Sequence, residues 1–140
     1  MKKRSLINIG VCIIIILSGC RKENATYNPI VGNWELNSHS VFSNGVLAYN
    51  YDYVSGKSFI YKFNENNTYA LSSVDSLLES GSYELYNDTL YHHYMGIGIE
   101  RFGYQHYSIS ANKLTLSDSG NDSSGDFTEF FIYTRVHKIF

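Results

Sequence analysis

The stretch VGNWELNSHSVFSNGVLAYNYDYV, residues 31–54, decides the fold because it has the pattern of a β-hairpin. From Val31 to Phe42 apolar and polar side chains alternate, and this period of two is typical of a strand. Ser43-Asn44-Gly45 then predicts a tight turn, because Asn and Gly tolerate the positive φ angles that hairpins need. A second strand follows from Val46 to Val54. The stretch therefore predicts two antiparallel strands joined by a hairpin.

The same alternation and turn chemistry continue along the chain at intervals of about ten residues, and no segment has a convincing helical period. Turns are predicted at NENN (64–67), Asn87-Asp88 and Ala111-Asn112, and DSGNDSSG (118–125) is predicted to be a polar loop. Further strands are predicted at 58–63, 68–74, 81–86, 89–95, 97–110 with a bend at Gly103, 113–117 and 126–136.

These elements predict an all-β domain of about eight to nine strands, each adjacent to the next in sequence. An antiparallel up-and-down meander of this length closes most simply into a barrel, because closure removes the exposed sheet edges. We therefore predict one β-barrel domain over residues 30–140. Residues 21–29, RKENATYNP, show no periodicity and are predicted to connect this domain to what precedes it.

The N-terminal segment differs in character from the rest of the chain. A basic start, Lys2-Lys3-Arg4, precedes an apolar run from Leu6 to Leu17, which is 12 residues long. A membrane-spanning helix needs about 20 residues, so this run is too short to cross a bilayer. A basic start, a short apolar run and small residues before a cut are typical of a secretory signal peptide.

The end of this segment carries a family resemblance. Leu17-Ser18-Gly19-Cys20, within IIIILSGCRKEN (13–24), resembles the lipobox of bacterial lipoproteins. The resemblance implies that residues 1–19 are cleaved, that the Cys20 sulfur receives a diacylglycerol, and that residues 20–29 form a lipidated tether. Two or more acyl chains anchor a protein stably. The expected location is the bacterial cell envelope, at the periplasmic or surface face of the outer membrane.

Composition excludes several other classes of protein. Cys12 lies in the segment predicted to be removed, so the mature chain would have no disulfide, no thiol catalyst and no cysteine-based zinc site. Loss of the three basic N-terminal residues changes the formal net charge from −2 to −5. An acidic domain is not suited to binding nucleic acid. The membrane is the partner expected through the N-terminal lipid.

A second resemblance covers nearly the whole mature chain. IVGNWELNS (30–38) resembles the Gly-x-Trp opening strand of lipocalins, and the later hairpins are similar to those of small bacterial lipocalin-like lipoproteins. The resemblance implies a lipocalin-like barrel in which Trp34 packs under Arg135 to close one end. The hairpins that carry it are YKFNENNTYAL (61–71), ESGSYELYNDTLYHH (79–93), YSISANKLTLSD (107–118) and FIYTRV (131–136).

Tyrosine is abundant, with 13 in the chain, and some of these side chains are candidate ligand contacts. Tyr49, Tyr51 and Tyr53 share one face of a predicted strand and could line a cup, with hydroxyl groups that orient a ligand. Tyr91 and Tyr104 extend the same set. The alternative is that these residues are good strand formers that pair across strands.

The histidines and the polar loop are candidate metal ligands. His92 and His93 would face opposite sides of a strand, so one of them, His93, could join His106 with Glu100 near in sequence. The alternative is exposed histidines that titrate near neutral pH. The loop at 118–126 lacks the EF-hand pattern and is expected to be a solvated hairpin. We expect no metal and no cofactor.

No catalytic motif is present, and the chain is not expected to be an enzyme. Two functions remain open. The first is an envelope lipoprotein that binds a small apolar or amphiphilic ligand in its barrel. The second is a protein-interaction module, such as an inhibitor or an accessory subunit of an envelope complex, without a ligand cavity. Ser76 and Thr89 lie in sequences that resemble the Asp-[Ser/Thr]-apolar glycosylation acceptor of Bacteroidota, and are candidate sites of that modification.

Overall fold

The structure is a computed structural model that describes residues 28–96, 99–123 and 125–137. Cys20, the segment before it and most of the expected tether lie outside these ranges. Within them every regular element is a β-strand, as the alternation predicted. The nine strands are β1 (Gly32–Ser43), β2 (Val46–Asp52), β3 (Ile60–Phe63), β4 (Thr68–Ser72), β5 (Leu77–Tyr86), β6 (Thr89–Gly96), β7 (Ile99–Ser110), β8 (Lys113–Asp122) and β9 (Gly125–Val136).

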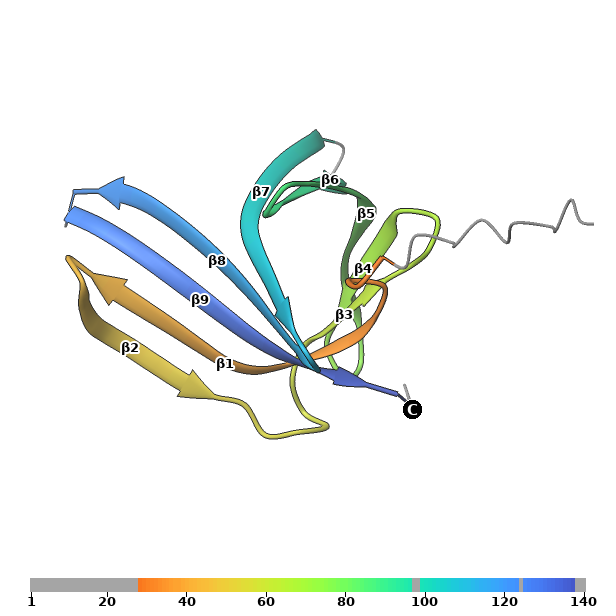
Figure 1. Cartoon of the computed structure of the whole chain (residues 1–140), viewed down its shortest axis with the longest axis horizontal. Helices are drawn as coiled ribbons and strands as arrows, with labels where there is room; N and C mark the ends of the chain where they lie inside the picture. Colours follow the sequence, from red (N-terminus) through yellow and green to blue (C-terminus); the bar gives the residue numbers. More distant parts are fainter. Residues whose placement is uncertain (1–27, 97–98, 124, 138–140) are drawn as a thin grey trace, which may run out of the picture.

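The strands form one antiparallel sheet that closes on itself. From β3 to β9 each strand pairs with the next one in sequence. The first strand, β1, pairs with β3 through Gly32–Glu35 and with β9 from Asn33 to Ser43. These two pairings complete an eight-stranded barrel from β1 and β3 to β9 (Figure 1). The predicted up-and-down barrel is therefore confirmed.

The position of β2 differs from the prediction that all neighbouring strands pair in order. After the turn at Asn44-Gly45, where both φ angles are positive, β2 folds back onto the second half of β1, at Ser38–Ser43. It stays outside the eight-stranded ring, and all seven of its residues are exposed. The reason is the length of β1, whose first residues pair with β3 and whose later residues pair with β2.

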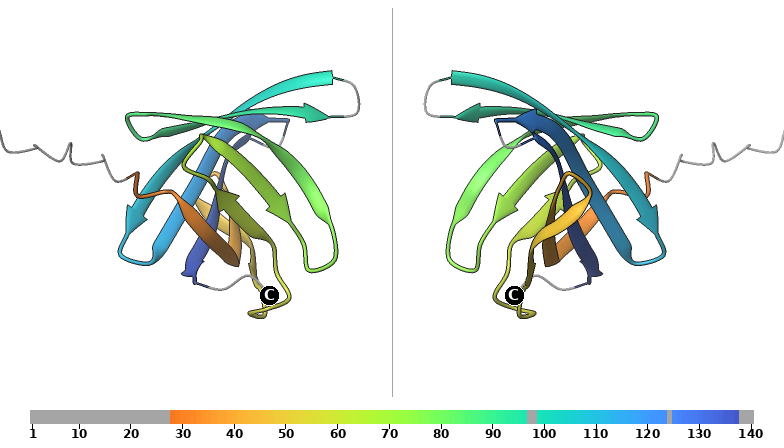
Figure 2. Two further views of the ribbon diagram at one scale, coloured as in Figure 1. Left: turned by 90° about the vertical axis from the view of Figure 1, so that its right-hand side faces the viewer. Right: turned by 90° about the vertical axis from the view of Figure 1, so that its left-hand side faces the viewer.

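The barrel is closed at one end and open at the other. β7 pairs with β8 only through His106–Ser110, while the earlier half of β7 stays with β6 and the later half of β8 stays with β9. The β6–β7 pair therefore diverges from β8, β9, β1 and β2, as Figures 1 and 2 show. We call the open end the mouth. We call the four-stranded extension beside it, residues 38–52 and 117–131, the arm.

The prediction of a loop at 118–125 is wrong, because most of this stretch is strand. β8 continues to Asp122 and β9 begins at Gly125, with residue-by-residue pairing from Asp118 to Asp122. Polar side chains are compatible with strand here because both faces of the arm are partly exposed to water. Polarity indicated solvent contact correctly, but it did not indicate a loop. The fifth strand likewise begins at Leu77, four residues before its predicted start at Gly81.

A packed core fills the closed end. Trp34 is fully buried, and its indole N–H donates a hydrogen bond of 2.7 Å to the carbonyl of Ile30. The Arg135 guanidinium lies 4.3 Å from the Trp34 ring and donates to the carbonyls of Val31 and Pro29. Such a cation–π contact contributes about 0.5–2 kcal/mol. The buried cluster also contains Leu36, Tyr61, Phe63, Tyr69, Tyr83, Leu90, Leu114, Leu116 and Tyr133.

Candidate functional site

A hollow of about 220 Å³, open to solvent, is lined mainly by side chains of the inner barrel face beside the packed core. We call it the interior pocket. Apart from Tyr104, whose side chain belongs to the outer face, its lining residues occupy alternating strand positions on the same face of the sheet as the core residues. An eight-stranded barrel is just wide enough to hold one small ligand. The pocket is lined by Tyr61, Glu79, His92, Tyr94, Gly103, Tyr104, Gln105 and Asp118.

Glu79 on β5 supplies a fixed carboxylate to one wall. The hydroxyl group of Tyr69 on β4 donates a hydrogen bond of 2.5 Å to Glu79 Oε1. Burial raises the pKa of Tyr61 and of Tyr69, and the adjacent Glu79 carboxylate raises both further. Both phenols are therefore neutral at physiological pH, so Tyr69 remains a donor and holds Glu79 in place.

His92 on β6 forms a second part of the wall and is only 6% exposed. Its ring lies 6.0 Å from the Tyr61 ring and 5.1 Å from the Tyr69 ring, measured between centroids. Burial lowers the pKa of His92 to about 4, an effect that the neighbouring Gln105 side chain partly offsets. Neither ring nitrogen has a hydrogen-bond partner of good geometry among the described residues. His92 is thus a neutral, buried polar group beside the cavity.

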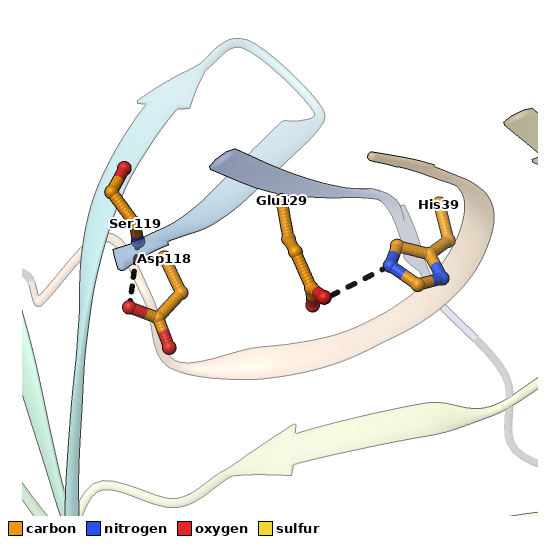
Figure 3. A network of polar contacts seen from close by, with 4 residues as sticks. All are labelled: His39, Asp118, Ser119 and Glu129. Atoms are coloured by element: carbon orange, nitrogen blue, oxygen red, sulfur yellow. Dashed lines mark hydrogen bonds and ion pairs between the residues drawn. The ribbon is translucent and has the colours of Figure 1, made fainter. Parts of the chain in front are cut away.

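Asp118 adds a second carboxylate to the lining, and Glu129 lies next to it outside the lining. Asp118 on β8 and Glu129 on β9 are direct cross-strand partners, and Figure 3 shows them with their nearest polar contacts. Glu129 lies 3.6 Å from His39 Nε2, and the His39 ring stacks on Phe131 at 4.3 Å. Asp118 accepts a hydrogen bond of 2.7 Å from the backbone N–H of Ser119. Like charges directly opposite each other destabilise a sheet unless a cation neutralises them.

The predicted tyrosine row lies beside the barrel ring. Tyr49 and Tyr51 on β2 are 48% and 50% exposed, on the face of the arm that continues the inner surface of the barrel. Tyr49 contacts the His39 ring edge to face, and Tyr51 contacts Tyr53 in the same way. Tyr53 follows β2 and packs against Phe59 at the margin of the core. The three residues therefore form one row, which extends outward from the mouth.

Tyr91 and Tyr104 are brought together, but on the outer surface of the barrel. They are direct partners across β6 and β7 and are 45% and 62% exposed. Next to them the ring of His93 stacks on Phe102 at 4.5 Å. We call this group the outer aromatic face. A hollow of about 220 Å³ on this face is lined by Ser82, Tyr83, Glu84, Tyr91, His92, His93, Phe102 and Gly103.

The structure does not bring His93 and His106 close together. They pair with Phe102 and Thr89 respectively, which places them four positions apart along β7, or about 13 Å. His106 instead lies 3.6 Å from the Asp88 carboxylate. In the part of the chain that the structure describes, no three His, Cys, Asp or Glu side chains are grouped so that they could hold a metal ion.

Sequence reasoning did not find the interior pocket. Glu79 shares the period of Tyr83 and Leu85, so alternation alone could have placed it on the inner face. Asp118 falls in the stretch predicted to be a loop, and the adjacent pair His92-His93 indicates only opposite faces of a strand. Their convergence depends on the pairing of β5, β6, β7 and β8, which no local pattern gives. Ser76 is exposed in the β4–β5 connection, and Thr89 is half-buried at the start of β6.

No protein-family model matches the chain, and no curated protein matches it in sequence. Fold and site therefore define the class: an eight-stranded antiparallel β-barrel with one additional strand, compatible with a lipocalin-like fold. Among the described residues there is no helix long and apolar enough to span a membrane.

Proposed function

We propose that the chain is a lipid-anchored lipoprotein of the bacterial cell envelope whose barrel binds a small ligand in the interior pocket. The observation that carries this proposal is the hollow beside the core, where neither nitrogen of the buried His92 has a hydrogen-bond partner of good geometry among the described residues, although the Gln105 side chain lies next to it. A buried polar group without a partner costs about 1–3 kcal/mol. A bound ligand that hydrogen-bonds to His92 would offset that cost. Clefts with a few convergent polar groups are the usual form of a ligand site.

An amphiphilic ligand fits the surroundings of the pocket better than a purely apolar one. Glu79, His92 and Asp118 offer polar contacts within the cavity. Beyond them the inner face of the arm presents apolar and aromatic side chains, including Phe131 and Tyr51. The polar end of the ligand would enter the cavity, and its apolar part would lie along the arm.

Native mass spectrometry of the full-length protein, extracted from membranes in a mild detergent, tests ligand binding. Gly103→Leu provides a blocked pocket, because Gly103 lines the cavity and a Cβ there would meet no atom within 4 Å. We expect a bound small molecule on the wild type and on the control Ser108→Leu, on the exposed side of β7, but not on Gly103→Leu. Repeatedly clean wild-type spectra, or an adduct that survives Gly103→Leu, would contradict the proposal.

The lipid anchor is proposed from the lipobox resemblance at Cys20. We expect the mature protein to begin at Cys20 and to carry the mass of two or three acyl chains. Cys20→Ser should move the protein from the outer-membrane fraction to the soluble fraction or leave it as uncleaved precursor. Intact mass measurement of both forms tests this. A mature wild-type protein without acyl mass would refute the anchor and leave the ligand proposal untouched. We propose no catalytic activity.

The outer aromatic face favours a second candidate function, a protein-interaction module. Phe102 is 75% exposed and Tyr104 is 62% exposed, which is unusual for neighbouring aromatic residues unless a partner covers them. Cross-linking in intact cells, followed by purification, should then recover one dominant envelope protein. Tyr104→Ser and Phe102→Ser should abolish its recovery, while Ser108→Leu, farther along the exposed side of β7 and outside the hollow on that face, should not. Recovery that is equal in all variants would argue against this function.

A further inference from the structure

We propose that the interior pocket selects ligands that carry a compact positive charge, namely small organic amines or quaternary ammonium compounds. This inference rests on the proposed ligand-binding function and specifies the chemical class of the ligand. It comes from the charges on the inner face of the barrel, from the aromatic rings beside them and from the size of the cavity.

Carboxylates approach the cavity from two walls. Glu79 lies on β5, where the Tyr69 hydroxyl group holds it, and Asp118 lines the same pocket from β8. Glu129 is the direct cross-strand partner of Asp118, so two acidic side chains stand side by side on that wall. A cationic group in the pocket near Asp118 would relieve this repulsion.

Cations within the barrel are few among the described residues. His39 is next to Glu129, and it bears a charge only when protonated. Arg135 lies at the closed end over Trp34. Strand alternation places Arg101 on the inner face at the rim, where it is exposed and two positions beyond Gly103. The depth of the pocket therefore has two carboxylates and no cationic side chain among its lining residues.

The remaining lining groups suit an ammonium group. Tyr61 and Tyr94 present aromatic rings, and a ring face attracts a cation within about 6 Å. The buried His92 is neutral near pH 7, so it adds no repelling charge and retains one nitrogen lone pair as an acceptor. It is an independent sign of a ligand, because its nitrogens have no partner of good geometry within the described residues, Gln105 being its nearest polar neighbour, although it borders the cavity.

The size and chemistry of the site favour an organic cation over a metal ion. No group of three potential metal ligands exists among the described residues. The volume of about 220 Å³ exceeds the roughly 150 Å³ of an apolar cavity that accommodates benzene. A benzyl-sized amine therefore fits, with its nitrogen between Glu79 and Asp118.

Three probes of nearly equal size test the inference: benzylamine, benzyl alcohol and benzoate, which are positive, neutral and negative at pH 7. Their affinities for the full-length protein in a non-ionic detergent would be measured by calorimetry. We expect benzylamine to bind at least tenfold more tightly than benzyl alcohol, and benzoate to bind more weakly than either. Equal affinities, or a preference for benzoate, would overturn the inference while leaving an interior site intact.

Variants that each remove one negative charge show which carboxylates cause the preference for a cationic ligand. Asp118→Asn and Glu79→Gln should each reduce the ratio of benzylamine to benzyl alcohol affinity by about fivefold or more, with benzyl alcohol affinity nearly constant. The control, Glu84→Gln, changes an exposed carboxylate on the opposite face of β5 and should leave the ratio unchanged. Far-ultraviolet circular dichroism checks that each variant is folded. A ratio that persists in both pocket variants would overturn the inference. Absence of binding by all three probes, together with clean native spectra, would instead refute the proposed function.

Discussion

Glu35 shows how one buried side chain can organise a connection. It lies on β1, is 8% exposed, and its carboxylate accepts hydrogen bonds from Ser55 Oγ, Gly56 N–H and Ser58 Oγ. These three donors come from the segment that leads from β2 back to β3. The acidic side chain therefore holds the chain where it leaves the arm and re-enters the barrel.

Glu35→Ala should lower the free energy of unfolding by about 2–4 kcal/mol, because it leaves three donors without their charged acceptor. Urea denaturation followed by tryptophan fluorescence measures the change, since Trp34 is the only tryptophan. Glu84→Ala, at an exposed position, is the control and should change stability by less than about 0.5 kcal/mol. Equal losses in the two variants would mean that the Glu35 contacts contribute little.

His92 makes stability depend on pH in a defined direction. Burial lowers the pKa of His92 in the folded state to about 4 from 6.5. The groups around His92 or its cavity are Tyr61, Tyr69, Gln105, Glu79 and Asp118. Between these two pKa values the unfolded chain binds the proton and the folded chain does not. The contribution of His92 to the free energy of unfolding is therefore greatest above about pH 6.5, and it is lost as the pH falls toward 4.

The corresponding free energy is at most about 3.4 kcal/mol. His92→Phe keeps an aromatic ring of similar size and removes the titrating group. We expect the loss of stability between pH 7 and pH 4.5 to be smaller in His92→Phe than in the wild type by about 1–3 kcal/mol. Urea midpoints at the two pH values give this difference. The contributions of the carboxylates to the pH dependence are the same in both proteins and therefore cancel. Identical pH dependence would show that His92 is not buried in solution.

At the scale of the elements, one glycine decides how closely β5 and β6 can approach. A Cβ atom on Gly81 would collide with the backbone carbonyl oxygen of His93 and press on Tyr94 Cα. Backbone atoms cannot move aside as the end of a flexible side chain can, so the strands would have to separate locally. This point lies beside the interior pocket, since His92 and Tyr94 flank it.

Gly81→Ala should therefore lower the free energy of unfolding by about 2–4 kcal/mol. Gly103→Ala is the matched control, because Gly103 lies in β7 of the same sheet and has nothing within 4 Å of a Cβ position. We expect the control to change stability by less than about 1 kcal/mol. Chemical denaturation of both variants measures the contrast. A Gly81→Ala protein as stable as Gly103→Ala would require a wider β5–β6 spacing than the structure has.

The strands and their turns were predictable from local pattern, because alternation and turn residues act over short distances. The turn at Asn44-Gly45 has positive φ at both residues, and Asn87 and Ala111 also have positive φ at the predicted turns. Alternation gives the face of a residue, but it does not give its partner strand. The division of β1 between β3 and β2, and the meeting of Glu79 with Asp118, depend on pairings between distant segments. For that reason the barrel was predicted and the interior pocket was not.

At the scale of the whole molecule, the two ends of the barrel differ in how much they bury. The closed end contains Trp34, Leu90, Leu114 and Leu116, all with no exposed surface. The arm has a fully exposed edge strand, β2, and large exposed side chains such as Val46 and Leu47. Opening the arm would therefore expose little additional apolar surface, whereas opening the closed end would disrupt the core.

This asymmetry predicts a gradient of local stability that amide hydrogen exchange can measure. Amides of β3, β4 and the first half of β8 should exchange only through global unfolding, while those of β2 should exchange through local opening at least a hundredfold faster. A ligand that bridges Glu79 and Asp118 connects the β5 wall to the base of the arm. Benzylamine at saturation should then slow exchange in the second half of β8 and in β7 near Gly103, and leave β2 nearly unchanged. Uniform exchange along the chain would mean that the arm is as tightly held as the core. Slowing confined to the outer aromatic face would mean that the probe binds there and not inside the barrel.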